Sequence, residues 1–258
     1  MKMTVCGKGG CGKSTVTTLL SQEFARMGKK VLVVDSDESN FGLHRQLGME
    51  LPRDFTEFFG GKEKAMKKML SGEIMTSMKL QAFAKKFFSE PFQMCEIPDE
   101  YLSEKDGVKL LSSGKIHKAN EGCACPMNSI LRQFLTHLTL ADDEVAILDM
   151  EAGVEHFGRG TDNNVDAVLM VIDPSFESMR LAEKVAELCG SIHKPIYFFL
   201  NKVTPENEAA MEATVSKYGK VIGKMPLDAA IGQAGFTGEP LTGTYPQIQQ
   251  VAKTLLGA

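Results

Sequence analysis

A glycine-rich octapeptide near the start of the chain constrains the fold more than any other feature of the sequence. Residues 7–14 read Gly-Lys-Gly-Gly-Cys-Gly-Lys-Ser and match the pattern Gly-x-x-x-x-Gly-Lys-Ser/Thr. The apolar segment Met3–Cys6 precedes the octapeptide, and the helix-forming segment Thr15–Met27 follows it. Backbone amides in such a loop surround phosphate oxygens, and the start of the helix adds partial positive charge. The sequence therefore predicts a P-loop between a strand and a helix.

The residues of this loop have separate expected tasks. Lys13 is expected to reach the β and γ phosphates of a nucleotide, and Ser14 is expected to be a ligand of Mg²⁺. The predicted phosphate-binding residues are Gly7, Lys8, Gly9, Gly10, Cys11, Gly12, Lys13, Ser14 and Thr15. The sequence thus predicts binding of a nucleoside triphosphate together with Mg²⁺.

Short apolar segments recur between helix-forming segments along the rest of the 258 residues. Beyond the first strand, the predicted strands are Lys30–Val34, Val108–Leu111, Val145–Leu148, Ala167–Ile172, Pro195–Leu200 and Val221–Ile222. Strands that are apolar along their whole length are typical of a parallel sheet covered by helices on both faces. We therefore predict an α/β fold, with a doubly wound and mainly parallel sheet flanked by helices, in a single domain over residues 1–258.

Residues 52–97 depart from this alternation. They contain no clear strand, and their Phe, Met and Lys pattern predicts a helical insertion. Seven lysines stand against two glutamates between Lys62 and Lys86. Met and Phe at helical spacing favour a contribution to the core with a solvated lysine face. A surface that docks a partner is the alternative interpretation.

Carboxylates follow two of the predicted strands. Asp35 and Asp37 come after the second strand, and Asp149 follows the apolar segment Val145–Leu148. Ligands of open α/β sheets bind beyond the carboxyl ends of the strands, so these side chains are expected beside the P-loop. Carboxylates in such positions hold Mg²⁺ or its water ligands, or they orient an attacking water. The predicted magnesium ligands are Ser14, Asp37 and Asp149.

Two further loops contain polar residues whose roles the sequence leaves open. Residues 150–160 contain three glycines and predict a switch loop that moves with the γ phosphate. His156 and Arg159 lie in this loop, where each is either a proton relay or an ordinary surface residue. Asn40 is either a contact to the nucleotide or the partner, or a simple turn residue.

The residues after the strand Pro195–Leu200 bear on the choice of base. Asn201 and Lys202 follow this strand, where an amide side chain can pair with a purine edge. The next residues are Val203 and Thr204, so the aspartate of a guanine-selective Asn-Lys-x-Asp motif is absent. The sequence therefore favours adenine over guanine and predicts ATP and ADP as the nucleotides.

Cys123 and Cys125 form a Cys-x-Cys pair before the helix-forming segment Asn128–Leu138. Two thiolates can bind one metal ion, but they leave the coordination of Zn²⁺ or Ni²⁺ incomplete. A two-fold dimer would supply a second pair. Thiolates accept Zn²⁺, Ni²⁺ or an iron–sulfur cluster, so the ligand type does not select the metal. Inert thiols and a redox disulfide are the alternatives, and His117 and Cys95 are further ligands to consider.

The composition and the charge limit which cellular compartment and which classes of partner are expected. The formal net charge of -4 gives no overall attraction to nucleic acid. The chain opens directly into a strand, and it has no apolar segment near the roughly 20 residues of a membrane span. We therefore expect a cytoplasmic protein that binds neither nucleic acid nor membrane. Its six cysteines are expected to be reduced, as is usual in that compartment.

The loop, with Lys8 in its second position, resembles the deviant Walker A family. That family includes the nitrogenase iron protein, the MinD and ParA partition ATPases and several metallocentre-assembly ATPases. Their early lysine crosses a two-fold interface to the phosphates of the partner subunit, so the resemblance implies an ATP-dependent homodimer. It also implies that Asp37 orients the attacking water and that Pro226, Leu227 and Asp228 lie on the adenine side. The catalytic residues are then Lys8, Lys13, Asp37 and Asp149.

Four strings together resemble the CooC accessory ATPases of nickel-containing carbon monoxide dehydrogenase. They are GKGGCGKST, VVDSDESN, EGCACPMN and LDMEAGVEHFGRG. The resemblance implies ATP-controlled delivery of Ni²⁺ to the C-cluster of that enzyme, with the metal on Cys123 and Cys125 at the dimer interface. The closest alternative cargo is nickel for acetyl-CoA synthase or an iron–sulfur cluster. Two other classes are an ATPase positioned on DNA or membrane, which the acidic charge disfavours, and an electron-donating reductase.

Overall fold

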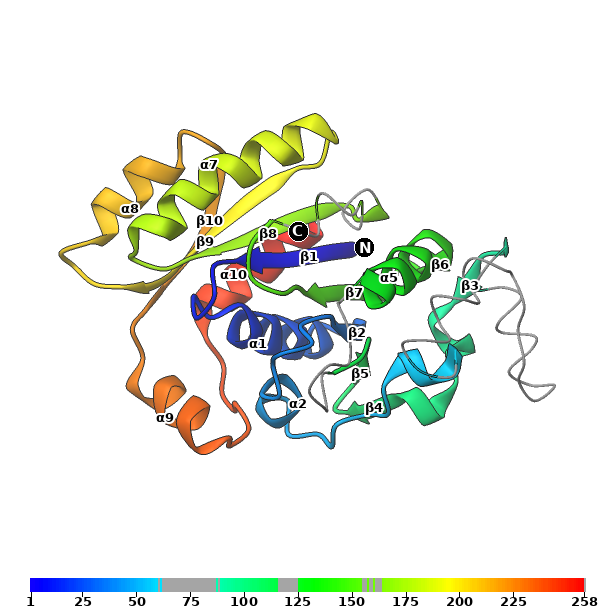
Figure 1. Ribbon diagram of the computed structural model, residues 1–258. Coiled ribbons are helices and arrows are strands. Elements are labelled where there is room, and N and C mark those ends of the chain that lie inside the picture. Colours follow the sequence, from blue (N-terminus) through cyan, green and yellow to red (C-terminus); the bar gives the residue numbers. More distant parts are fainter. Residues whose placement is uncertain are drawn as a thin grey trace.

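An eight-stranded sheet forms the centre of the protein in the computed structural model, which describes residues 1–59, 61, 87, 89–115, 125–154, 157, 160 and 164–257 (Figure 1). For residues 125–129 it describes the backbone alone. The strand order is β10-β9-β8-β1-β7-β2-β5-β4. The strands are β1 Lys2–Gly7, β2 Lys30–Asp35, β4 Leu102–Lys105, β5 Val108–Ser112, β7 Glu144–Asp149, β8 Ala167–Ile172, β9 Ile196–Val203 and β10 Lys220–Pro226. Neighbouring strands are parallel except for the pair β4 and β5.

Helices cover both faces of this sheet. Apolar side chains of α1 (Lys13–Arg26), α2 (Leu43–Gln46) and α10 (Pro246–Leu256) share one core. Those of α5 (Cys125–His137), α7 (Phe176–Ser191) and α8 (Glu208–Val215) share the core on the other face. The doubly wound, mainly parallel α/β fold predicted from the sequence is therefore confirmed. A further helix, α9 (Ala229–Thr237), follows β10 and has no buried residue.

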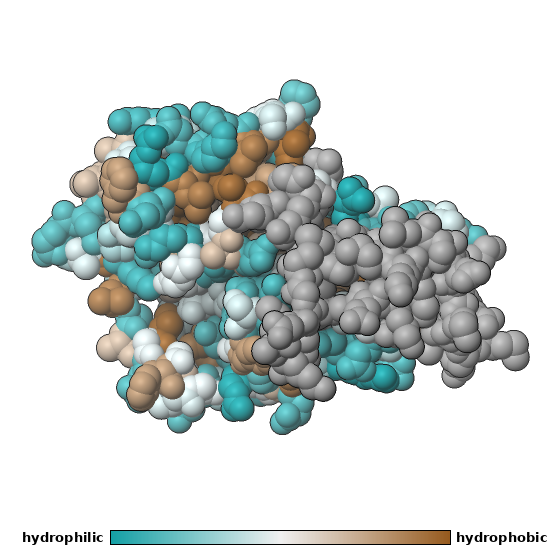
Figure 2. Space-filling view, in the orientation of Figure 1, coloured by the Kyte–Doolittle hydropathy of each residue, from teal (hydrophilic) through white to brown (hydrophobic). Residues whose placement is uncertain are grey.

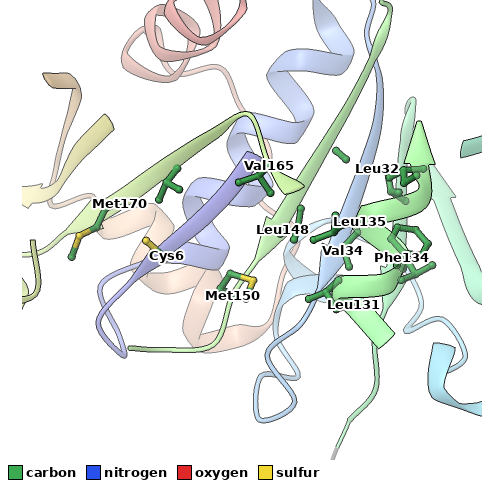
Figure 3. Close-up of a cluster of buried hydrophobic side chains, with 14 of the residues drawn as sticks. Cys6, Leu32, Val34, Leu131, Phe134, Leu135, Leu148, Met150, Val165 and Met170 are labelled. Carbon is green, nitrogen blue, oxygen red and sulfur yellow. The ribbon is translucent and has the colours of Figure 1, made fainter. Parts of the chain in front are cut away.

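The central strands β7 and β8 are buried along their whole length because both faces of the sheet are covered there. All six residues of β8 are buried, as are all six of β7. On α5, Leu131, Phe134 and Leu135 recur at the spacing that places side chains on one face of a helix. Figure 3 shows these side chains against the strand residues around Val34 and Leu148. This contact holds α5 against the sheet. Because the end of α5 leads through β6 to the start of β7, Cys125 at the beginning of α5 lies at the end of the helix remote from the start of β7.

Most of the helical insertion predicted over residues 52–97 lies outside the described residues. At its described ends the region contains the helical residues Phe87 and Ser89, two 3-10 turns, Phe55–Phe59 and Met94–Glu96, and the two-residue strand β3 (Phe92–Gln93). β3 pairs with β6 (Leu138–Thr139) directly after α5. The expectation of a lysine-bearing helical surface over Lys62–Lys86 lies outside the described residues.

Aromatic packing attaches the first of these turns to α5 and to the sheet edge. The ring centroid of Phe55 lies 5.7 Å from those of Phe134 and Tyr101. Tyr101 ends a further 3-10 turn, Asp99–Tyr101, which leads directly into β4. β4 pairs antiparallel with β5 and was not predicted, because its sequence, Leu-Ser-Glu-Lys, lacks an apolar run.

Candidate nucleotide site

The predicted site residues gather at one edge of the sheet. β1, β2, β7, β8, β9 and β10 run parallel, so their carboxyl ends and the following loops meet there. A cavity of about 580 Å³ opens between these loops. Its lining comes from the P-loop, the loop after β2 and the loop after β7. The lining residues are Gly9, Gly10, Gly12, Lys13, Ser14, Thr15, Asp37, Glu38, Ser39, Asn40, Gln46, Glu151 and Ala152.

The P-loop adopts a conformation that requires glycine at several positions. Gly10 and Gly12 have φ angles of 76° and 101°, in the left-handed region that residues with a side chain rarely adopt. A Cβ atom on Gly12 would also collide with the side-chain amide of Asn201. α1 begins at Lys13, so the unpaired amides of its first turn face the cavity edge. These features fit a bound phosphate chain.

Ser14 and Asp149, two of the three predicted magnesium ligands, contact each other. The Ser14 hydroxyl donates to Asp149 Oδ2 at 2.6 Å, and Thr17 Oγ1 donates to Asp149 Oδ1 at 3.3 Å. On the other side, Asn40 Nδ2 donates to Ser14 Oγ at 2.7 Å. A hydroxyl and a carboxylate are the hard oxygen ligands that Mg²⁺ prefers, so these residues fit that cation.

Burial perturbs the acids beside this site. Asp149 is fully buried, and burial raises its pKa to about 6, with Asp37 raising it further against the opposing effects of Ser14 and Lys13. Burial likewise raises the pKa of Asp35 to about 7, although the cation of Lys115 opposes this rise. A cation bound nearby would lower these two pKa values, because a positive charge favours the ionised form of a carboxyl group.

Asp37 faces the cavity from the loop after β2. Its carboxylate accepts hydrogen bonds from the backbone N–H of Ser39 at 3.0 Å and from Ser39 Oγ at 2.6 Å. Its own N–H donates to Asp35 Oδ1 at 3.2 Å. The loop therefore forms a compact turn that places Asp37 and Asn40 on the lining of the same cavity as Ser14.

Two other P-loop side chains point inward. Lys13 is only 7% exposed, and its ammonium donates to the backbone oxygen of Lys8 at 3.3 Å. Cys11 is fully buried, and burial raises the pKa of its thiol to about 11. A thiol with this pKa is protonated at neutral pH, so Cys11 contributes to the loop through its backbone and its packing.

Lys8 does not point into the cavity formed by its own loop. Its ammonium donates to Ser175 Oγ at 3.1 Å and lies 3.8 Å from both Asp173 Oδ2 and Glu177 Oε2. Ser175 caps α7, and Asp173 accepts hydrogen bonds from the hydroxyls of Ser175 and Ser178. Burial opposes ionisation of Asp173, but these hydroxyls and Lys8 hold its pKa below the ordinary value.

A second cavity of about 210 Å³ adjoins the first at Gly10, Gly12 and Thr15. All five residues predicted on the base side line it. They are Asn201, Lys202, Pro226, Leu227 and Asp228.

Three of these base-side residues also have contacts that the sequence did not indicate. Asn201 Nδ2 donates to the carbonyl of Cys11 at 2.8 Å, and Lys202 Nζ donates to that of Gly10 at 2.7 Å. Asp228 caps α9 by accepting from the N–H groups of Ala230 and Ile231. The side chains of Asn201 and Lys202 thus stabilise the P-loop by hydrogen bonds to its carbonyls. Asp228 fixes the start of α9 beside the cavity.

Lys115 is a site residue that the sequence analysis missed. Its side chain is fully buried, and its ammonium lies 2.7 Å from Asp35 Oδ2. It also donates to the carbonyls of Asp37 at 2.6 Å and Asn40 at 2.5 Å. The one sequence signal for this role is a lysine three residues after an apolar strand, which by itself is common.

Comparison with known proteins settles the family. The family model described as the CobQ/CobB/MinD/ParA nucleotide binding domain matches residues 2–241. The chain belongs to this family. The MinD structures of Pyrococcus horikoshii, complexed with Mg-ADP, and of Aquifex aeolicus share the fold, with TM-scores of 0.68 and 0.65 at 16% and 18% identity. These alignments cover 98% and 100% of this chain and 95% and 97% of the MinD chains.

Curated relatives within this family match the chain over nearly its whole length. An uncharacterized ATP-binding protein of Methanocaldococcus jannaschii is 46% identical over 99% of both chains. The carbon monoxide dehydrogenase accessory protein CooC of Rhodospirillum rubrum is 29% identical over 100% of this chain and 95% of its own. The chain is thus a P-loop nucleotide-binding protein of the MinD/ParA type.

The predicted metal ligands are only partly within the described residues of this family member. Cys123 and His117 lie outside them, and of Cys125 the structure gives the backbone, at the first residue of α5. His156 and Arg159, the possible relay residues of the predicted switch loop, also lie outside the described residues. In the part of the chain that is described, no group of three or more His, Cys, Asp or Glu residues could hold a metal ion.

Cys95, which the sequence analysis considered as a further ligand, is exposed and follows β3. β3 pairs with β6, directly after the last residue of α5, whereas Cys125 is the first residue of that helix. Thirteen helical residues span roughly 20 Å, so Cys95 lies at the far end of α5 from Cys125. Within one subunit, Cys95 is therefore not a ligand of a metal held by Cys125.

Among the described residues, no helix combines the length and the apolar character that crossing a membrane requires.

Proposed function

We propose that this protein is an ATP-hydrolysing switch that dimerises with ATP, carries a metal ion on Cys123 and Cys125, and delivers nickel to the C-cluster of carbon monoxide dehydrogenase. The observation that carries the proposal is that the nucleotide site and the start of α5 lie close to the same edge of the sheet. The helix that begins at Cys125 starts at the same edge of the sheet as the P-loop and Lys8. A nucleotide switch and a thiol pair on one edge can act on each other.

The direction of α5 supports this placement of the thiol pair. β5 and β7 are both parallel to β2, so the segment between them must return along the sheet. The end of α5 leads through β6 into the start of β7, at the amino edge. Its beginning at Cys125 therefore faces the carboxyl edge, where the nucleotide cavity lies.

The nucleotide part of the proposal assigns each cavity residue a task. The P-loop amides and Lys13 hold the phosphates, and Ser14 and Asp149 hold Mg²⁺, which supplies positive charge to the phosphate oxygens. Asp37 accepts a hydrogen bond from the attacking water and orients it toward the γ phosphate. Asn201, Lys202, Pro226, Leu227 and Asp228 form the base side, where adenine binds.

The dimer part of the proposal rests on Lys8 and on an apolar surface. The Lys8 ammonium points out of its own cavity, as expected for a lysine that serves a partner's nucleotide. The exposed large apolar residues among those described are Phe41, Phe176, Leu227 and Phe236. Phe41, Phe176 and Leu227 lie in the segments that follow β2, β8 and β10 at the carboxyl edge, and Figure 2 shows pale and brown surface over α9. Apolar residues gathered on one edge favour a protein contact there.

The cargo and the client come from the CooC relative, together with the chemistry of a thiolate pair. A closed dimer would bring four thiolates, two from each subunit, around one metal ion, and four is the number that completes a tetrahedral site. Delivery of nickel to another enzyme such as acetyl-CoA synthase, or transport of an iron–sulfur cluster, is the second candidate. It uses the same switch and the same thiols.

Activation of the client tests the proposal. Nickel-free carbon monoxide dehydrogenase is incubated anaerobically with limiting Ni²⁺, Mg-ATP and either wild type or Cys123→Ser/Cys125→Ser. We expect faster activation with wild type than with the double variant, and no acceleration when ADP replaces ATP. Equal activation by wild type and the double variant would refute metal delivery by this pair. Absorption near 400 nm in the anaerobically purified wild type would favour an iron–sulfur cargo.

A further inference from the structure

A buried lysine joins the segment after β5 to the loop that faces the nucleotide cavity. Lys115 has no solvent-exposed side-chain surface, and its ammonium is within hydrogen-bond distance of three oxygens. One is the Asp35 carboxylate at the end of β2, and two are the carbonyls of Asp37 and Asn40. An ammonium group has three donors, so these oxygens match its full donor capacity.

The two carbonyl contacts distinguish this arrangement from a simple buried ion pair. Neutralising Asp35 requires only a positive charge nearby, whereas holding two carbonyls of one loop fixes the shape of that loop. The loop places the side chains of Asp37 and Asn40 on the cavity lining, and Asn40 Nδ2 reaches Ser14 Oγ at 2.7 Å. A continuous series of hydrogen bonds therefore runs from Lys115 through Asn40 to Ser14 and Asp149.

The backbone of Lys115 is itself fixed. Its N–H donates to Asp54 Oδ2 at 3.1 Å, and Ser112 Oγ donates to Asp54 Oδ1 at 3.1 Å. The N–H of Ser113 donates to the carbonyl of Asp35 at 2.9 Å. The lysine thus extends from a rigid support toward the loop after β2, which is the arrangement needed to impose a conformation on that loop.

We propose that Lys115 is a positioning residue for ATP hydrolysis, which holds the loop Asp37–Asn40 so that Asp37 faces the γ phosphate. The role of Lys115 rests on the ATP hydrolysis in the proposed function but not on its metal cargo. The three hydrogen bonds of the Lys115 ammonium end on Asp35, Asp37 and Asn40 rather than on the phosphate-binding amides or the base-side residues, so we expect the P-loop and the base-side cavity to keep their shape without it. Binding of ATP is then retained, while the attacking water loses its orientation.

Two variants separate this role from charge compensation. Lys115→Met removes the ammonium and leaves Asp35 as an unpaired buried acid, which reduces stability. Asp35→Asn/Lys115→Met removes both charges and restores thermal stability, but it still leaves the two loop carbonyls without the ammonium. Lys109→Met is the matched control, because Lys109 lies on β5 and pairs with the exposed Glu104 at 3.5 Å.

The full-length variants are compared for steady-state ATP hydrolysis, ATP affinity and melting temperature. We expect kcat to fall about 10- to 100-fold in both Lys115 variants, the range for a misplaced reacting group, with ATP affinity within about threefold of wild type. Lys109→Met should match wild type. If Asp35→Asn/Lys115→Met recovers both melting temperature and kcat, or if kcat and affinity fall in parallel, Lys115 is structural and the inference is wrong.

The same experiment separates this inference from the proposed function. A wild type that hydrolyses ATP but does not transfer nickel refutes the cargo and leaves the role of Lys115 standing. Wild type and Lys115→Met that hydrolyse ATP equally refute the role of Lys115 alone. A wild type with no hydrolysis, with or without metal and client, refutes both.

Discussion

The ammonium of Lys8 donates a hydrogen bond to the hydroxyl of Ser175 at 3.1 Å, so this side chain attaches the P-loop to the start of α7. The neighbouring carboxylates of Asp173 and Glu177, each 3.8 Å away, keep the ammonium in this position. In an isolated subunit Lys8 therefore lies next to its own α7. To serve the nucleotide of a partner subunit, it must exchange these contacts for contacts to phosphate.

Replacement of Lys8 tests this exchange. Lys8→Ala is expected to retain ATP binding, because Lys13 and the P-loop amides remain, and to lose the ATP-dependent dimer. Light scattering after size exclusion, with and without Mg-ATP, measures the dimer fraction. Lys184→Ala is the matched control, since Lys184 is an exposed lysine of α7 that pairs with Glu187. An ATP-dependent dimer of Lys8→Ala with the wild-type dissociation constant would contradict a role for Lys8 in trans.

The raised pKa of Asp149 predicts how the stability of the nucleotide-free protein changes with pH. Its pKa is about 6 in the folded chain and about 3.9 in an unfolded chain, so between these values the folded state binds more protons. The free energy of unfolding contributed by this group therefore falls as pH rises from about 4 to 6. The slope is at most about 1.4 kcal/mol per pH unit.

Asp149→Asn isolates this contribution, because the amide cannot ionise. The difference in unfolding free energy between the variant and wild type, measured by urea denaturation, should shift in favour of the variant as pH rises through this window. Mg-ATP should reduce the shift, since the bound cation favours the ionised carboxylate. A difference that does not change between pH 4 and 6 would show that burial does not perturb this acid.

The sequence predicted those parts of the fold that burial determines. β8 has the bounds expected for Ala167–Ile172, because a strand covered on both faces is apolar throughout. β4 was missed because its polar sequence lies at the sheet edge, where only one neighbour is needed. Most of the predicted helical insertion lies outside the described residues. The 3-10 turns and the short strand β3 at its described ends were not predicted, because they depend on tertiary contacts such as those of Phe55 and Phe92.

The same distinction applies to the candidate site: residues placed by local sequence were predicted, and residues placed by tertiary contacts were not. The P-loop, Asp37 and Asp149 were found because strand ends and local motifs place them. Lys115 was missed because its partner Asp35 is 80 positions away along the chain, and no local pattern records that proximity. The contacts of Asn201 with the P-loop likewise depend on the order of strands in the sheet, which the sequence does not state.

Metal content measured together with oligomeric state tests the central claim most directly. Wild type, Cys123→Ser and Cys125→Ser are loaded anaerobically with Ni²⁺, with and without Mg-ATP. They are then separated by size and assayed for nickel and protein in each fraction. The account predicts about one nickel ion per two chains in the ATP-dependent dimer of wild type, and loss of that nickel in both variants. Nickel bound equally by wild type and variants, or bound by monomers independently of ATP, would contradict it.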